Sequence, residues 1–250
     1  MASDWYQERL QNMISISYPH KMVENKIWEI LFKTKPLILG GHLEFLGLHA
    51  EGYLRMWNIN QHPEYLKRIC DVITACVRGS SLKPNVVLAP GSQGMYYAQD
   101  IAAKMEGVRA VYTGIEPETG RPTNEFLYGS RINPGDQVVI VNDINVTGES
   151  LRRLIELVKS KKAEVLGTCV FADMSGGRAE IKREYPFHSV INLNLPFWPE
   201  NVCTQNCDGK PLVTMWQIMR SPVIPGDVAY EALLSRQNNS GGWLPWNLKI

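Results

Sequence analysis

The chain has 250 residues, with 26 basic and 25 acidic side chains, and its formal net charge at pH 7 is +1. This balance argues against a charged tail that binds nucleic acid, and an apolar share of 44% argues against intrinsic disorder. A chain of this length buries roughly 70–75% of its unfolded surface, so we expect one sizeable core.

The cellular compartment that we expect follows from features that the sequence lacks. The longest apolar runs, such as Val138 to Val141, fall far short of the roughly 20 residues that cross a bilayer. The first ten residues carry acidic and polar groups and lack a signal-peptide core. The five cysteines are an odd number, which does not indicate a disulfide framework. We therefore expect a cytoplasmic protein with no membrane partner.

The first third of the chain is predicted to hold helices and a hairpin. Apolar spacing predicts helical structure over residues 5 to 33, with a break at Tyr18-Pro19. The glycine-punctuated segment from Leu37 to Tyr53 is predicted as strands or a hairpin. His62-Pro63 indicates a helix start, and a helix is predicted from Glu64 to Val77.

The middle of the chain alternates between short apolar runs and amphipathic segments. Helices are predicted from Met95 to Met105 and from Glu149 to Ser160. Strands are predicted at Val86–Ala89, Val108–Tyr112, Val138–Val141 and Val165–Ala172, with a further candidate at Val190–Leu195. This alternation predicts an α/β fold whose central sheet is mainly parallel, with helices on both faces. The segment from Thr113 to Gly135 has no apolar periodicity and is predicted as a long functional loop.

The most informative segment runs from Val138 to Ser150. An apolar strand is followed by Asn142-Asp143 and then by Thr147-Gly148-Glu149-Ser150, which opens an amphipathic helix. Ligands of open α/β sheets bind at the carboxyl ends of strands, and a helix N-terminus presents free N–H groups to phosphate. Gly148 would let the backbone approach the anion, and Asp143 would accept hydrogen bonds from sugar hydroxyls. The alternative is an ordinary helix start that Thr147 or Glu149 caps.

This segment resembles the diphosphoribosyl-binding motif of type I phosphoribosyltransferases. Three other stretches are similar to the orotate phosphoribosyltransferase branch, in the right order. Ala89 to Gly94 resembles its pyrophosphate-binding loop, Gly41 to Tyr53 its N-terminal substrate segment, and Cys203 to Leu212 a cysteine-containing C-terminal stretch of some members. Together the resemblance spans roughly residues 40 to 212.

The resemblance implies a type I phosphoribosyltransferase fold with a small hood, and a homodimer. On this basis we expect an N-terminal helical segment with hood elements over residues 1–60, a core over 61–200 and a C-terminal extension over 201–250. No helix-turn-helix and no basic stripe is evident in the sequence, so we expect no nucleic-acid partner.

The resemblance also implies a reaction. With Mg²⁺ bound, the phosphoribosyl group of the diphosphoribosyl donor PRPP would move to a nitrogenous base, and pyrophosphate would leave. Asp143 and Asn142 would be the catalytic pair facing the ribose hydroxyls, with Asp143 also the metal contact. The residues implied to hold PRPP are Asn145, Val146, Thr147, Gly148, Glu149 and Ser150 at the 5′-phosphate, Gly91, Ser92, Gln93 and Gly94 at the pyrophosphate, and Arg121 on the closing loop.

The chain departs from the family pattern at several positions. Asn142 replaces the first acid of the pair, Gln93 stands where the orotate branch usually has lysine, and Arg121 is the only central cation of the predicted closing loop. These departures also fit a second hypothesis, in which a degenerate member binds PRPP or a nucleotide as a sensor or regulator.

The implied base-binding residues depart too. Met174 follows Asp173 where the orotate enzymes have arginine, and Phe45 stands in place of a lysine. A buried carboxylate without a cation is costly, so we expect a base other than orotate, contacted by Phe45, His49, Tyr53 and Met174. The alternative is a displaced alignment in which Arg178 meets the base.

Metal chemistry away from the phosphate loop has one candidate in the sequence. Cys203 and Cys207, with His188 upstream, suggest zinc, but a single cysteine pair lacks the four ligands that a structural site needs. Packing as small apolar side chains is therefore the favoured interpretation of these cysteines.

Overall fold

The computed structural model describes residues 2–17, 21–45, 47–80, 82–91, 93–117, 119–177, 179, 181–203, 209–214 and 217–218. The chain divides into two compact units. The first comprises Met1–Lys33 and Ile59–Asn194, and the second comprises Thr34–Asn58 and Leu195–Ile250. Among the described residues, no helix combines the length and the apolar character that crossing a membrane requires.

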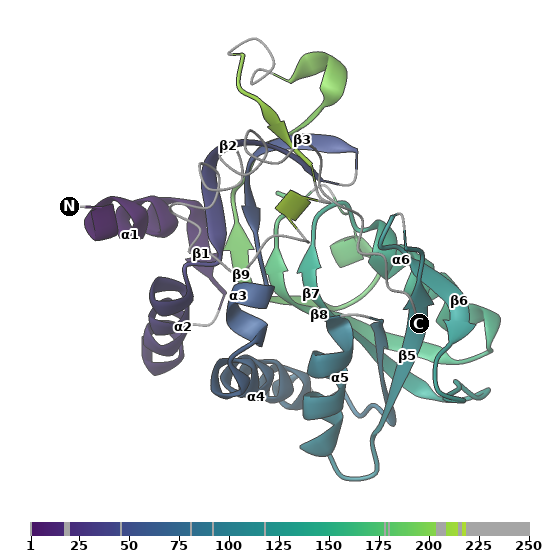
Figure 1. The fold of residues 1–250 in the computed structure, drawn as a ribbon. Helices are drawn as coiled ribbons and strands as arrows, with labels where there is room; N and C mark the ends of the chain where they lie inside the picture. The colour runs from purple at the N-terminus through teal and green to yellow at the C-terminus, as the bar shows by residue number, and fades with distance from the viewer. Residues whose placement is uncertain are drawn as a thin grey trace, which may run out of the picture. The chain divides into compact units, whose positions relative to one another are not determined.

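The first unit is built on a seven-stranded sheet in the order β1-β9-β8-β7-β4-β5-β6 (Figure 1). The five inner strands are mutually parallel, whereas β1 and β6 pair antiparallel at the two edges. The strands are β1 (Ile14–Ile16), β4 (Val86–Pro90), β5 (Arg109–Ile115), β6 (Pro122–Phe126), β7 (Gln137–Asn145), β8 (Glu164–Asp173) and β9 (Phe187–Leu193).

Helices accompany this sheet on both faces, as the alternation in the sequence predicts. Figure 1 shows α4 and α5 side by side, and α5 contacts β4, β5 and β7. The helices are α1 (Ala2–Met13), α2 (Lys21–Thr34), α3 (Trp57–Asn60), α4 (Pro63–Gly79), α5 (Gly94–Ala103) and α6 (Glu149–Ser160), with a short 3₁₀ turn η1 (Ile181–Arg183).

Helix α6 packs because its apolar residues recur at helical spacing. Leu151, Leu154, Ile155 and Val158 form one stripe, which lies in a buried cluster with alternate residues of β4 and β7. Strand β4 is buried along its whole length and reads as a continuous apolar run, which is typical of a central strand in a parallel sheet. The core of the first unit therefore fixes where β7 ends and where α6 begins.

The second unit holds a four-stranded sheet in the order β10-β3-β2-β11. Strands β2 (Leu37–Phe45) and β3 (Leu48–Leu54) form the predicted antiparallel hairpin. Strand β10 (Phe197–Pro199) pairs antiparallel with β3, and β11 (Leu212–Val213) pairs parallel with β2. The 3₁₀ turn η2 (Glu200–Val202) follows β10.

The structure corrects two of the sequence predictions. The segment from Thr113 to Gly135 is not one long loop, because its first residues end β5 and Pro122–Phe126 form β6, which pairs back on β5. The region predicted as helical from residue 5 to residue 33 contains strand β1, which pairs with β9. Tyr18 and Pro19, the predicted helix break, lie outside the described residues.

Candidate functional site

The turn between β7 and α6 is the candidate phosphate loop. Gly148 is the residue before the helix, and its φ of +81° lies in the left-handed region. A Cβ added there would lie 2.8 Å from the Cβ of Ala179 and 3.1 Å from its carbonyl oxygen. Both the left-handed backbone and the lack of space for a Cβ therefore require a glycine at this position. The turn therefore leads directly into the N–H groups that open α6, which have no carbonyl partner within the helix.

Thr147 also takes part in the helix start, as the alternative interpretation expects. Its hydroxyl oxygen accepts a hydrogen bond from the Glu149 N–H at 3.3 Å. This bond uses one N–H of the first turn, and an arriving anion would compete for it. Val146 and Gly148 are buried, whereas Thr147, Glu149 and Ser150 are partly exposed.

Asn142 and Asp143 lie inside the last part of β7 rather than after it, and both are partly exposed. The amide nitrogen of Asn142 donates to the Ile144 carbonyl at 3.0 Å, so its Oδ1 is the atom left to accept hydrogen bonds. The Ile144 N–H donates to Asp143 Oδ1 at 2.8 Å. Desolvation raises the pKa of the Asp143 carboxyl to about 6, against the opposite effect of these backbone N–H groups. Asp143 is therefore mostly ionised at neutral pH.

A buried polar contact joins the carboxyl ends of β7 and β8. The side-chain amide of Asn145 donates to Asp173 Oδ1 at 3.0 Å, and the Ser175 N–H donates to the same oxygen at 3.1 Å. The Met174 N–H in turn donates to the Asn145 carbonyl at 2.7 Å. Asn145 and Met174 are both buried, so these bonds tie the start of the phosphate loop to the end of β8, and the predicted contact of Asn145 with the 5′-phosphate stays a prediction.

The β4–α5 turn carries the candidate pyrophosphate loop. The Gly91 N–H donates to the Thr113 carbonyl at 2.8 Å, and a Cβ on Gly91 would lie 2.9 Å from that carbonyl oxygen. A Cβ on Gly94 would lie 3.0 Å from Cδ of Pro90. These close approaches explain glycine at both positions. Ser92, also predicted to bind pyrophosphate, lies outside the described residues.

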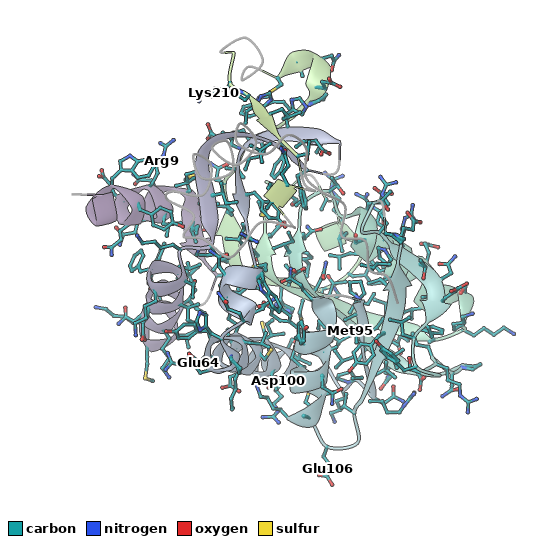
Figure 2. All side chains as sticks on the ribbon, in the orientation of Figure 1. Arg9, Glu64, Met95, Asp100, Glu106 and Lys210 are labelled. Atoms are coloured by element: carbon teal, nitrogen blue, oxygen red, sulfur yellow. The ribbon has the colours of Figure 1, made fainter. Side chains whose placement is uncertain are left out.

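Gln93 in this loop is held by a chain of two hydrogen bonds, one partly buried and one buried. Asn60 donates its amide N–H to Gln93 Oε1 at 2.7 Å, and the Tyr97 hydroxyl donates to Asn60 Oδ1 at 2.9 Å. Tyr97 lies on α5 between Met95 and Asp100, which Figure 2 labels. Burial raises the pKa of Tyr97 well above its ordinary value, and the negative charge of Asp143 raises it further. Tyr97 therefore stays neutral at physiological pH and keeps the hydroxyl hydrogen that it donates to Asn60.

The β5–β6 hairpin contacts the first turn of α6 through a network of charges. Arg121 lies 2.9 Å from Glu149, and Arg153 contacts both Glu149 at 3.4 Å and Glu116 at 3.1 Å. Thr119 donates its hydroxyl to Glu116 at 2.6 Å. Arg121, predicted to reach PRPP, is therefore paired with an acid of the phosphate loop. The sequence analysis did not include Arg153 among the residues of the site. Its position four residues after Glu149 on a helix could have predicted their ion pair.

An open cavity of about 500 Å³ lies at the carboxyl ends of β8 and β9 in the first unit. Its only charged lining residue among those described is Asp173. The lining comprises Gln11, Asn12, Met13, Ile14, Ser15, Asp173, Gly176, Gly177, Asn192, Leu193 and Asn194. Arg178, the alternative base contact, lies outside the described residues.

Three of the predicted base-binding residues belong to the second unit. Phe45 and Tyr53 are buried against each other, with ring centroids 5.0 Å apart. His49 is buried, and its Nδ1 lies 2.9 Å from His42 Nε2. The fourth, Met174, is fully buried in the first unit. Their contact with a base stays a prediction.

A strand, a glycine turn and a helix N-terminus at the carboxyl edge of a parallel sheet are typical of α/β proteins that bind phosphate groups. The model of the phosphoribosyl transferase domain family matches residues 56–203, which is more than half of the chain, and the chain belongs to that family. Its type I fold, a mainly parallel sheet with helices on both faces, agrees with the architecture described above.

Named relatives agree with this family. The chain is 29% identical over 185 residues to an orotate phosphoribosyltransferase of Carboxydothermus hydrogenoformans, which covers 73% of this chain and 93% of that protein. The orotate phosphoribosyltransferase structure from Mycobacterium tuberculosis H37Rv has a TM-score of 0.53 at 20% identity and covers 66% of this chain and 95% of that one. The adenine phosphoribosyltransferase structure from Leishmania donovani has a TM-score of 0.52 at 21% identity, over 66% and 78% of the two chains. These two structural likenesses concern the fold.

Proposed function

We propose that this protein transfers the phosphoribosyl group of PRPP to an uncharged nitrogenous base, with Mg²⁺, and releases pyrophosphate. The observation that carries the proposal is the left-handed Gly148 turn, which joins the strand bearing Asp143 to the N-terminus of α6. A 5′-phosphate on the first N–H groups of α6 would place its ribose beside the last part of β7, which carries Asn142 and Asp143.

In the proposed reaction, a ring nitrogen of the base forms a bond to the anomeric carbon while the bond from that carbon to pyrophosphate breaks. The proton of that ring nitrogen passes to the leaving pyrophosphate or to solvent. Positive charge develops on the ribose in an oxocarbenium-like transition state. The ionised Asp143 carboxylate accepts hydrogen bonds from ribose hydroxyls and stabilises that charge, and the Gly91–Gly94 backbone holds the leaving pyrophosphate. Closing the β5–β6 hairpin over the site would exclude water, which competes as a nucleophile.

The residues at the end of β7 fit a magnesium ion bound together with PRPP. Mg²⁺ prefers oxygen ligands and is usually held by one or two carboxylates with substrate phosphates. Asp143 supplies a carboxylate, and Asn142 has an available Oδ1 because its amide nitrogen is used by Ile144. When bound, the ion would neutralise negative charge on the pyrophosphate group.

The preference for an uncharged base rests on the described residues that line the cavity at the ends of β8 and β9. The described lining of this cavity contains no lysine or arginine, and the resemblance to the orotate enzymes implies an arginine where this chain has Met174. Orotate is the substrate in the names of the curated relatives, and its carboxylate would lose water without gaining a cation here. A neutral purine or pyrimidine avoids that cost.

A second candidate function is a sensor that binds PRPP without turning it over. Asn142 lacks the charge of the family's first acid, and the hairpin cation Arg121 is engaged by Glu149. Both features favour binding over catalysis. They do not weaken the phosphate loop itself.

The experiment is a calorimetric titration with PRPP, with and without Mg²⁺, followed by pyrophosphate release with orotate, uracil, adenine and hypoxanthine. We expect saturable binding strengthened by Mg²⁺ and release with a neutral base. Binding without release on any base supports the sensor. Release that is fastest with orotate refutes the uncharged base, and an absence of binding refutes both functions.

Asn142→Asp tests whether the missing charge limits turnover. An added carboxylate should raise pyrophosphate release about tenfold or more, since such electrostatic contacts contribute a few kcal/mol. The matched control is Asn142→Ala, which removes the amide without adding charge and should lower release. Equal rates for the two variants would contradict the role of charge at this position.

A further inference from the structure

Three potential metal ligands meet in the second unit, and none of them belongs to the phosphate loop. His42 on β2, His49 on β3 and Cys203 after η2 place ligand atoms within 4.8 Å of one another. His42 and Cys203 are 161 positions apart in the sequence, so only the fold brings them together. All three side chains are buried, with exposed fractions of 2%, 5% and 3%. His188, the histidine suggested by the sequence, is not in this cluster.

The orientation of His42 is fixed by a backbone carbonyl. Its Nδ1 lies 2.8 Å from the carbonyl oxygen of Lys210, which is labelled in Figure 2. A carbonyl only accepts hydrogen bonds, so Nδ1 carries the proton and donates it. The neutral ring then presents the lone pair of Nε2 to His49 and Cys203. A carbonyl that accepts the second ring N–H is the usual support of a metal-binding histidine.

Two of the three separations between the ligand atoms are close to those around a tetrahedral zinc ion, and all three ligand atoms lie within 4.8 Å of one another. Zinc bonds of about 2.3 Å to sulfur and 2.0–2.1 Å to nitrogen place sulfur and nitrogen about 3.5 Å apart and two nitrogens about 3.3 Å apart. Here Cys203 Sγ lies 3.6 Å from His42 Nε2, and His42 Nε2 lies 2.9 Å from His49 Nδ1. The two rings would need to separate by only a few tenths of an ångström to admit the ion.

We propose that His42 Nε2, His49 Nδ1 and Cys203 Sγ bind a zinc ion that joins the β2–β3 hairpin to the segment after β10. On binding, the Cys203 thiol loses its proton to solvent and its thiolate bonds to the metal. His49 gives up the Nδ1 proton that it shares with His42 and carries a proton on Nε2 instead. One proton is released in total, and no oxidant or reductant is needed. The fourth position of the ion is filled by water or another group.

Thiolate and imidazole favour zinc over Mg²⁺, which prefers oxygen ligands. The zinc site is therefore chemically distinct from the proposed magnesium site at Asp143. It also does not depend on PRPP binding, so the two proposals fail separately.

The test measures zinc by mass spectrometry in the untagged, full-length protein purified without chelator. We expect about one zinc per chain, and less than about one tenth of that in Cys203→Ser and His49→Gln. The controls are Cys76→Ser and His62→Gln, which change a cysteine and a histidine of the first unit and should keep the metal. Circular dichroism checks that each variant is folded.

A second measurement does not depend on the variants folding. The wild-type protein is stripped of metal and refilled with Co²⁺, whose visible spectrum reports tetrahedral geometry and whose near-ultraviolet charge-transfer band reports a thiolate ligand. Both features are expected. Wild-type protein that binds no zinc and shows no cobalt–thiolate band overturns the proposal, as does a folded Cys203→Ser protein that retains full zinc.

Discussion

Replacing Gly148 by alanine should damage both stability and phosphate binding. The φ of +81° is unfavourable for a residue with a Cβ by about 1–2 kcal/mol. The new Cβ would also lie 2.8 Å from the Cβ of Ala179, whereas carbon atoms normally pack at about 3.5–4.0 Å. Overpacking of this kind costs about 1–3 kcal/mol.

Together these effects predict a loss of about 2–5 kcal/mol in the free energy of unfolding, and a Tm lower by roughly 4–20 °C in a chain of this size. Relief of the overlap would shift the start of α6, so the Kd for PRPP should rise about tenfold or more. Denaturant unfolding and calorimetric titration of the same preparation measure the two effects.

Gly135→Ala is the matched control. Gly135 has a φ of +84°, but a Cβ there would meet nothing within 4 Å. It should therefore lose only the backbone contribution of about 1–2 kcal/mol and keep its affinity for PRPP. If the two variants lose the same stability and bind PRPP equally well, the contact with Ala179 and the role of this turn in phosphate binding are both refuted.

Three further predictions concern the same unit. Asp143→Asn should abolish turnover, yet be more stable than wild type at pH 7.5 by up to about 3 kcal/mol. Since the folded-state pKa of about 6 lies above the ordinary 3.8, wild type should gain stability relative to this variant as pH falls from 6 to 4, measured by denaturant unfolding. Tyr97→Phe should cost about 1–3 kcal/mol in the same assay, because buried Asn60 Oδ1 loses its donor, and an unchanged midpoint would contradict this. Arg121→Ala should change stability by less than about 1 kcal/mol, because the ion pair is partly exposed, while the KM for PRPP rises; an unchanged KM would exclude Arg121 from the site.

The parts of the fold with strong apolar periodicity were predictable from the sequence. Helix α6 has the predicted bounds of Glu149 and Ser160, because its apolar stripe and its glycine start both mark them. Strand β7 is longer than its apolar run, since Asn142 and Asn145 pair with β8 although their side chains are polar. Strand β6 was missed for the same reason, as Pro122–Phe126 is largely polar and is held by pairing with β5.

The candidate site was predictable where one continuous segment forms it. The turn at Gly148 is readable because strand, glycine and helix follow each other directly. The hydrogen bonds from Tyr97 to Asn60 and from Asn60 to Gln93 could not be predicted from the sequence. Residues 60 and 97 lie on different helices, which only the fold brings together. The sequence did not indicate the cluster of His42, His49 and Cys203 for the same reason, and His188, which the sequence suggested beside Cys203, is not part of it.

The second unit is assembled from two segments that are far apart in the sequence, and this affects how it can fold while the ribosome makes the chain. Its sheet needs both Thr34–Asn58 and Leu195–Ile250, and all of Ile59–Asn194 is made between them. At roughly 5–20 residues per second, the β2–β3 hairpin waits about 10–30 s for β10 and β11. Both outer edges of the hairpin lack their eventual partner strands during that time. Exposed strand edges favour pairing with other chains, so the nascent protein should need chaperone protection most in this interval.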